Sequence, residues 1–173
     1  VLSTDPEGRE QKIDKPGTSL RAWCALRVKG QVRPYVSRAG EKLAGALDAF
    51  QIDPSSRICA DIGLSTGGFT DCLLRRGATR VHGVDVAYGV VDWRIRTDPR
   101  VVLHERTNAR HLPPDAFSEL VDLAVVDVSF ISVTAILPAL APNMSPDGRL
   151  VILVKPQFEA PRAKVRGGIV TDD

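Results

Sequence analysis

The chain has 173 residues, of which 43% are hydrophobic and 25% charged, the balance of a globular domain with a core. Its longest apolar run is five residues, which excludes a transmembrane helix of about 20. The polar, acidic first ten residues do not have the pattern of a secretory signal. The three cysteines form no CxxC pair, so we expect reduced thiols in a cytoplasmic protein, with no disulfide and no metal site.

Basic residues are concentrated near the beginning of the chain. Residues 1–42 carry nine lysines and arginines against five acids, whereas acids exceed bases in residues 43–154. Arginine accounts for 17 of the 23 basic residues, and its planar guanidinium suits phosphate. Nucleic acid is therefore a candidate partner, with a solvated basic surface as the alternative. The candidate RNA-binding residues are Arg27, Lys29, Arg33 and Arg38.

Residues 1–34 contain turn signals at Glu7-Gly8 and Pro16-Gly17 and a strand-like alternation at 25–29. This segment is too short to form a core alone, which indicates the end of a small β-containing module. A helix is expected at 37–50, with Ser37 as its N-cap.

The next hundred residues alternate between strand and helix patterns. Strands are predicted at 57–62, 79–86, 101–106, 120–128 and 149–154, and helices at 67–76, 90–96, 115–120 and 133–141. Several of these strands are almost entirely apolar, which is typical of a parallel sheet covered on both faces. The pattern predicts an α/β fold with a doubly wound, Rossmann-like sheet. A loop is expected from residue 157 onward.

A glycine-rich turn, DIGLSTGGFT at 61–70, follows the first of these strands. Glycine allows a sharp turn and a close backbone approach to a ligand, and the helix start offers free N–H groups. The Asp61 carboxylate would repel a pyrophosphate and favour a cationic group, such as the aminopropyl group of S-adenosylmethionine. Packing alone is the alternative explanation of the glycines. The candidate cofactor residues here are Asp61, Gly63, Ser65, Thr66, Gly67, Gly68 and Phe69.

Two later strand ends extend this candidate site. Asp85 lies 22 residues after Gly63, where an acid accepts hydrogen bonds from the ribose hydroxyls of an adenosine. Asn108 follows the third strand and is equally suited to contact an adenine edge or to cap the next turn.

Asp127 and Lys155 end the fourth and fifth strands, where an unpaired charge beside apolar sequence would be costly. They form either a structural ion pair or a functional pair in a cleft. Lys42 lies one position off the apolar stripe of the 37–50 helix and is either a third member or a solvated lysine.

Five segments together resemble the hemolysin A (TlyA) family of S-adenosylmethionine-dependent ribosomal RNA 2′-O-ribose methyltransferases, which have an FtsJ-like catalytic domain. They are YVSRAGEKL at 35–43, DIGLSTGGFTD at 61–71, GVDVAYG at 83–89, DVSFIS at 127–132 and LVKPQFE at 153–159. The resemblance implies S-adenosylmethionine as cofactor, ribosomal RNA or ribosomal subunits as partner, and no membrane. It also implies that residues 35–173 hold five of the usual seven strands. Residues 1–34 are more loosely similar to the end of an alpha-L RNA-binding domain plus a linker.

The resemblance further implies a catalytic Lys-Asp-Lys-Glu set, whose first three members match Lys42, Asp127 and Lys155. Glu159 belongs to a different motif, so the glutamate of the set is expected beyond residue 173. The catalytic domain is therefore expected to be C-terminally incomplete. Lys155 would contact the 2′-hydroxyl, and Asp127 would orient Lys155 and contact the cofactor. Lys42 would tune the charge or hold the adjacent phosphate.

Four other functions remain as alternatives. A methyltransferase of bases or proteins is disfavoured by the 5% aromatic content and by the lack of an Asn-Pro-Pro-Tyr motif after Asp127. A nonenzymatic RNA-binding or ribosome-assembly protein would share the fold. A hemolysin is disfavoured because the sequence shows no segment that would insert into a membrane, and a nicotinamide dehydrogenase would need a different glycine spacing.

Overall fold

The computed structural model describes residues 1–15, 17–27 and 34–171, and the chain forms two compact units, Val1–Arg33 and Pro34–Asp173. In the described part of the first unit, three short antiparallel strands pair in the order β2-β1-β3. They are β1 (Leu2–Thr4), β2 (Glu10–Lys12) and β3 (Ala25–Arg27). The predicted strand is therefore present up to Arg27, and its remaining residues lie outside the described ranges. That residues 1–34 end an RNA-binding domain stays a prediction.

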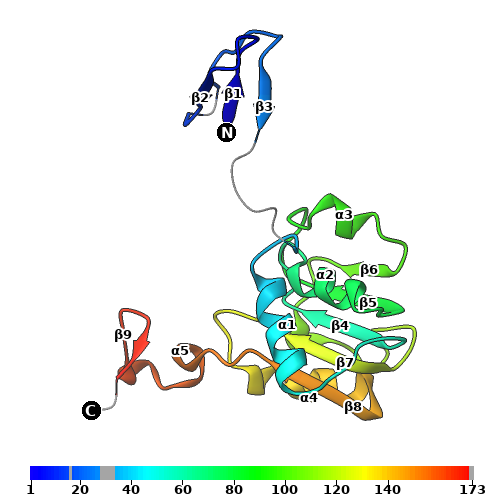
Figure 1. Ribbon diagram of the computed structural model, residues 1–173. Helices are drawn as coiled ribbons and strands as arrows, with labels where there is room; N and C mark the ends of the chain where they lie inside the picture. The colour runs from blue at the N-terminus through cyan, green and yellow to red at the C-terminus, as the bar shows by residue number, and fades with distance from the viewer. Residues whose placement is uncertain (16, 28–33, 172–173) are drawn as a thin grey trace. The chain divides into compact units, whose positions relative to one another are not determined.

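The second unit is built on a sheet whose described strands are all parallel and follow the order β6-β5-β4-β7-β8 (Figure 1). The strands are β4 (Ile58–Ile62), β5 (Arg80–Val84), β6 (Val101–His104), β7 (Val121–Val126) and β8 (Met144–Ile152). From β4 the chain builds outward to β6 and then returns to add β7 and β8 on the other side. The predicted doubly wound sheet is confirmed, and its switch point lies between β4 and β7.

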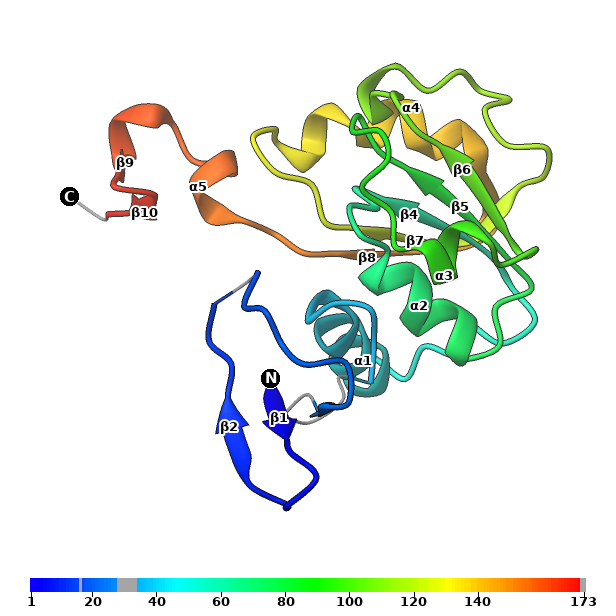
Figure 2. The same cartoon turned by 90° about the horizontal axis from the view of Figure 1, so that it is seen from above.

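Helices cover both faces of this sheet (Figure 2). On one face lie α1 (Ala39–Ala49) and α2 (Gly68–Arg75), and on the other lies α4 (Leu137–Leu140). The short helix α3 (Trp93–Arg96) follows β5 and buries Ile95. Side chains of successive strand residues point to alternate faces of the sheet: Cys59 packs toward α1 and α2, and Ala60 packs in the core on the other face.

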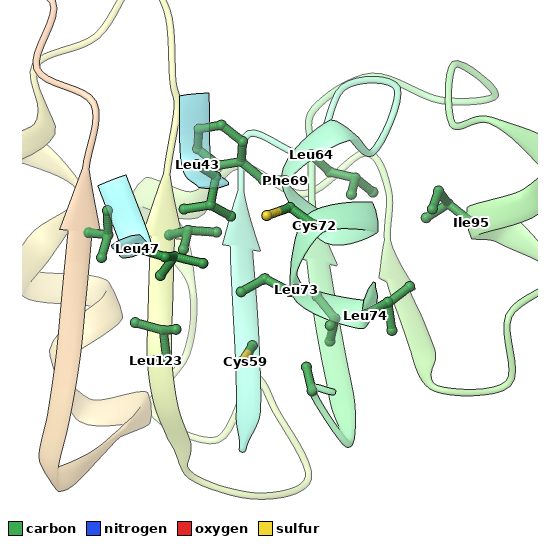
Figure 3. Close-up of a cluster of buried hydrophobic side chains, with 14 of the residues drawn as sticks. Leu43, Leu47, Cys59, Leu64, Phe69, Cys72, Leu73, Leu74, Ile95 and Leu123 are labelled. Atoms are coloured by element: carbon green, nitrogen blue, oxygen red, sulfur yellow. The ribbon is translucent and has the colours of Figure 1, made fainter. Parts of the chain in front are cut away.

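The core under α1 and α2 is made of aliphatic and sulfur-containing side chains together with the ring of Phe69 (Figure 3). Leu43 and Leu47 of α1 are almost fully buried, and Leu73 of α2 is completely buried. Below them, Cys59 of β4 and Leu123 of β7 form the floor of the cluster. This packing fixes where α2 begins, and hence the turn that precedes it.

Four local predictions are wrong. Residues 115–120 form no helix, because the amide of Asn143 holds the backbone of residues 113–116: Ala116 N–H donates to Asn143 Oδ1, and Asn143 Nδ2 donates to the Pro113 carbonyl. Ser37 is not the N-cap of α1, since Arg38 takes that position without a side-chain bond. The predicted helix 133–141 is divided into η2 (Val133–Ala135), α4 and η3 (Ala141–Asn143).

The fourth error concerns the last residues. The expected loop contains α5 (Pro156–Glu159), η4 (Arg162–Lys164) and a hairpin of β9 (Val165–Arg166) and β10 (Ile169–Val170). Its turn contains Gly167 and Gly168, both with positive φ angles, which explains why the sequence appeared irregular.

Candidate functional site

The turn after β4 is held close to the end of β7. Gly63 has a φ angle of 91°, and a Cβ there would lie 2.5 Å from the carbonyl oxygen of Asp127. Glycine is therefore required at this position both for backbone conformation and for space. At the other end of the turn, a Cβ on Gly68 would collide with Ser37 Oγ, so the lack of a side chain lets α2 start against α1. The predicted turn is thus built by close backbone contacts.

Asp61 is a buried carboxylate with one oxygen satisfied and one without a partner in the described residues. Its Oδ2 accepts hydrogen bonds from the backbone N–H and the hydroxyl of Thr70, at 2.9 and 2.8 Å. Its Oδ1 is buried and accepts no hydrogen bond in that part of the chain. Burial raises the pKa of Asp61 to about 7, with a further contribution from the carboxylates of Asp127 and Asp85.

Asp61 lines a cavity of about 190 Å³, which we term the Asp61 cavity. Its walls include Ser37 and Ala39 at the beginning of α1 and Lys155 after β8. The remaining predicted turn residues on this wall are Gly63, Ser65, Thr66, Gly68 and Phe69. Gly67, the N-cap of α2, lies between Thr66 and Gly68 in the sequence but is not among the lining residues. The Oδ1 of Asp61 is therefore an acceptor suited to a cationic group that enters this cavity.

A second cavity of about 270 Å³, the Asp85 cavity, lies beside it and is lined by Asp85, Asn108 and Phe130 among others. Gly63, Ser65, Asp127 and Ser129 line both cavities, so the two adjoin. Together they form one elongated site at the carboxyl ends of the strands, where doubly wound folds bind ligands.

Asp85 and Asn108 also have structural bonds within the chain. Asp85 accepts the N–H of Ser65 at 2.7 Å through Oδ2 and the N–H of Ala87 at 2.8 Å through Oδ1. It thus ties the β4 turn to its own loop. Asn108 accepts the N–H of Arg110 at 3.0 Å, so the capping alternative is realised, while the side chain still lines the Asp85 cavity.

Lys155 and Asp127 form an ion pair in which Asp127 lines both cavities and Lys155 lines the Asp61 cavity. Lys155 Nζ lies 2.6 Å from Asp127 Oδ1 and donates a hydrogen bond of 2.8 Å to Ser129 Oγ. The two charged side chains are only 22% and 17% exposed, so solvent screens the pair less than it would a surface pair. Ser129 was missed in the sequence, where a serine two residues after Asp127 gives no signal of its own.

Of the other predicted site residues, those that the structure describes line neither cavity. Lys42 is exposed on α1, and no contact between it and Asp127 or Lys155 occurs in the described residues; Ala39, three positions earlier, lines the Asp61 cavity. Arg27 forms an ion pair with Glu10 at 2.8 Å. Arg38 is exposed beside the start of α1, and Lys29 and Arg33 lie outside the described ranges.

Glu159 forms hydrogen bonds with residues other than those that contact Lys155. Its Oε1 accepts the N–H of Val133 at 2.9 Å, and its Oε2 accepts a short hydrogen bond from Ser132. The Ser132 hydrogen bond lowers the pKa of the Glu159 carboxyl. Glu159 therefore holds the loop after β7 in place and does not contact the Lys155–Asp127 pair.

The fold and the position of this site at the strand ends define a Rossmann-like methyltransferase domain. The chain belongs to the FtsJ-like methyltransferase family, whose model matches residues 35–173. In the described ranges, no helix is long and apolar enough to cross a membrane, and no three His, Cys, Asp or Glu side chains are grouped to hold a metal ion.

Two curated proteins and one solved structure are close relatives. The 16S/23S rRNA (cytidine-2′-O)-methyltransferase TlyA of Mycobacterium tuberculosis is 51% identical over 160 residues, which cover 91% of this chain and 60% of that protein. Hemolysin A of Brachyspira hyodysenteriae is 48% identical over 141 residues, covering 80% and 59%.

The solved structure is a Streptococcus thermophilus protein with the provisional name hemolysin. It matches with a TM-score of 0.80 at 43% identity, covering 99% of this chain and 62% of that one. The chain thus spans about 60% of the length of the curated relatives it matches.

Proposed function

We propose that the protein transfers a methyl group from S-adenosylmethionine to a ribose 2′-hydroxyl of ribosomal RNA. The observation that carries the proposal is the Lys155–Asp127 ion pair, in which Asp127 lines both cavities and Lys155 lines the Asp61 cavity. The name of the M. tuberculosis relative, an rRNA (cytidine-2′-O)-methyltransferase, supports the same reaction.

The residues around both cavities fit S-adenosylmethionine, which supplies a methyl group on a cationic sulfur when bound. The buried Oδ1 of Asp61 can accept a hydrogen bond from its ammonium group. Each oxygen of Asp85 already accepts one N–H and has a second lone pair for a ribose hydroxyl. The amide of Asn108 can donate to the adenine edge. Burying the ionised Asp61 carboxylate without a partner is unfavourable, so a cationic group beside Oδ1 would offset this desolvation cost.

Lys155 is the residue we assign to the substrate oxygen. A ribose hydroxyl is a weak acid, so its attack on the methyl group needs a partner that orients it and stabilises the negative charge on the oxygen while its proton passes to solvent water. An ammonium has three donors, and Asp127 and Ser129 occupy two directions around Nζ. The third is left for the 2′-oxygen. Holding the oxygen in line with the methyl group accounts for much of the rate enhancement we expect.

Lys42 and the N-terminal arginines are proposed RNA contacts. Lys42 lies one helical turn from Ala39 at the Asp61 cavity, a position suited to a phosphate next to the target ribose. Arg27, Lys29, Arg33 and Arg38 would contact phosphates elsewhere. A ribosomal RNA or ribosomal subunit as partner implies action in the cytoplasm.

Transfer of tritiated methyl groups to ribosomal particles tests this proposal. The full-length protein should label RNA of particles from cells that lack it, and calorimetry should detect S-adenosylmethionine binding. Binding to RNA with neither cofactor binding nor methyl transfer would instead identify a nonenzymatic RNA-binding protein on the same fold.

A further inference from the structure

Two segments that follow neighbouring strands, residues 127–133 after β7 and residues 155–159 after β8, are joined at three points. Lys155 donates to Ser129 at 2.8 Å. The rings of Phe158 and Phe130 lie 5.3 Å apart between centroids. Glu159 accepts from Val133 and Ser132. The contacts run in parallel along both segments, so the segment that carries Lys155 is fixed against the loop that carries Ser129.

Ser129 accepts a hydrogen bond from the Lys155 ammonium, in addition to the ion pair that this ammonium forms with Asp127. An ion pair with one carboxylate leaves a lysine free to rotate around that oxygen, because its long side chain has several rotatable bonds. A second acceptor on another residue removes this freedom. The Ser129 hydroxyl lines both cavities, so it lies where the direction of Nζ affects a bound substrate.

We propose that Ser129 is a positioning residue of the methyl-transfer site: its hydroxyl, together with Asp127, fixes the direction of the Lys155 ammonium, and Glu159 holds the loop that carries it. This inference rests on the proposed function. It assigns Ser129 no contact with the cofactor and no proton transfer. Removing the hydroxyl should therefore slow methyl transfer much more than it weakens cofactor binding.

Steady-state kinetics of Ser129→Ala and Ser129→Thr in the full-length protein test the proposal. Ser129→Ala should lower kcat by roughly 10- to 100-fold, the effect of small misplacements of reacting groups, with a much smaller change in the KM for S-adenosylmethionine. Ser129→Thr should restore most of kcat, because it keeps the hydroxyl and the exposed position has room for a methyl group. Ser55→Ala is the matched control: Ser55 is also exposed and donates to a carboxylate, Asp53, but lines neither cavity.

Competitive acetylation of lysines, read by mass spectrometry, gives a second measurement that needs no methyl transfer. Lys155 should be acetylated faster in Ser129→Ala than in the wild type or in Ser55→Ala, because its amine is less restrained. A Ser129→Ala protein with wild-type kcat and unchanged Lys155 labelling would overturn the proposal. An inactive wild-type protein would refute the proposed function, while the labelling result would still decide whether Ser129 restrains Lys155.

Discussion

Gly63 lies directly against the backbone carbonyl of Asp127, where a Cβ would be only 2.5 Å from the oxygen. Gly63 follows β4 and Asp127 follows β7, the two strands at the switch point of the sheet. This contact joins the glycine turn to the residue that pairs with Lys155. A change at Gly63 should therefore affect both cavities at once.

Gly63→Ala should lower the free energy of unfolding and weaken cofactor binding. The left-handed φ of 91° alone costs a side chain about 1–3 kcal/mol, and the contact with the Asp127 carbonyl adds to it. Urea unfolding and calorimetry would measure the two effects. Gly45→Ala is the control. Gly45 lies inside α1, and a Cβ there would meet nothing within 4 Å, so this substitution should raise the free energy of unfolding by about 0.5–1 kcal/mol. Equal stability of the two variants would contradict the assigned role of Gly63.

Asp61 should make the stability of the cofactor-free protein depend on pH. The pKa of Asp61 is about 7 in the folded protein, above the ordinary value of about 4, so the folded state holds a proton that the unfolded state releases. The stabilisation of the folded state by this proton is complete below about pH 4 and is lost as the pH rises to about 7. Relative to Asp61→Asn, which cannot ionise, the free energy of unfolding of the wild type should fall by up to about 4 kcal/mol over this range. A pH-independent difference in urea unfolding would contradict this.

The same carboxylate should make cofactor affinity increase as the pH rises through about 7, because a cationic group binds the ionised form. Asp61→Asn should bind S-adenosylmethionine more weakly and with less pH dependence. Calorimetry at pH 6 and pH 8 measures both. An Asn variant with wild-type affinity at pH 8 would show that no cation binds at Asp61.

Asp85→Ala should weaken S-adenosylmethionine binding by roughly 10- to 100-fold through the loss of ribose hydrogen bonds and of the two loop bonds. Asp98→Ala serves as the control, because Asp98 also accepts a backbone N–H, from Arg100, but lines neither cavity. Equal affinities of the Asp85 variant and the wild type would remove Asp85 from the cofactor site.

Affinity for ribosomal RNA should fall steeply with salt, because arginine–phosphate contacts release counterions. Arg38→Gln should reduce the slope of log affinity against log salt by about one. Arg27→Gln should have a smaller effect, since Glu10 lies 2.8 Å from Arg27 and offsets its charge. Filter binding over a salt series measures this, and a flat salt dependence would refute the electrostatic contacts.

Most of the sheet was predictable because its strands lie in short apolar runs that end in turn signals. The first part of β8, residues 144–148, was not, because Pro146, Asp147 and Gly148 are typical of a turn. Asp61, Asp85, Asp127 and Lys155 were predicted because charges at such strand ends are unusual. The sequence could not show that Asn143 satisfies the backbone of residues 113–116, since these partners lie 27 and 30 residues apart. This tertiary contact replaces the helix expected there.

The role of Ser129 was hidden for the same reason. Its bond to Lys155 spans 26 residues and depends on how the segments after β7 and β8 meet. Glu159, by contrast, was excluded from the catalytic set on its motif alone, and its bonds to Ser132 and Val133 give it a structural role.

The direct test of the proposed methyl transfer is a map of ribose methylation across ribosomal RNA in cells that carry the wild-type protein, Lys155→Ala or no protein. The wild type should add 2′-O-methylation at one or more positions that both other strains lack. The purified Lys155→Ala protein should still bind S-adenosylmethionine with nearly intact affinity, because Lys155 is assigned to the substrate oxygen. Identical methylation in all three strains, or full methylation by a folded Lys155→Ala protein, would contradict the account and leave Lys155 and Asp127 as a structural ion pair.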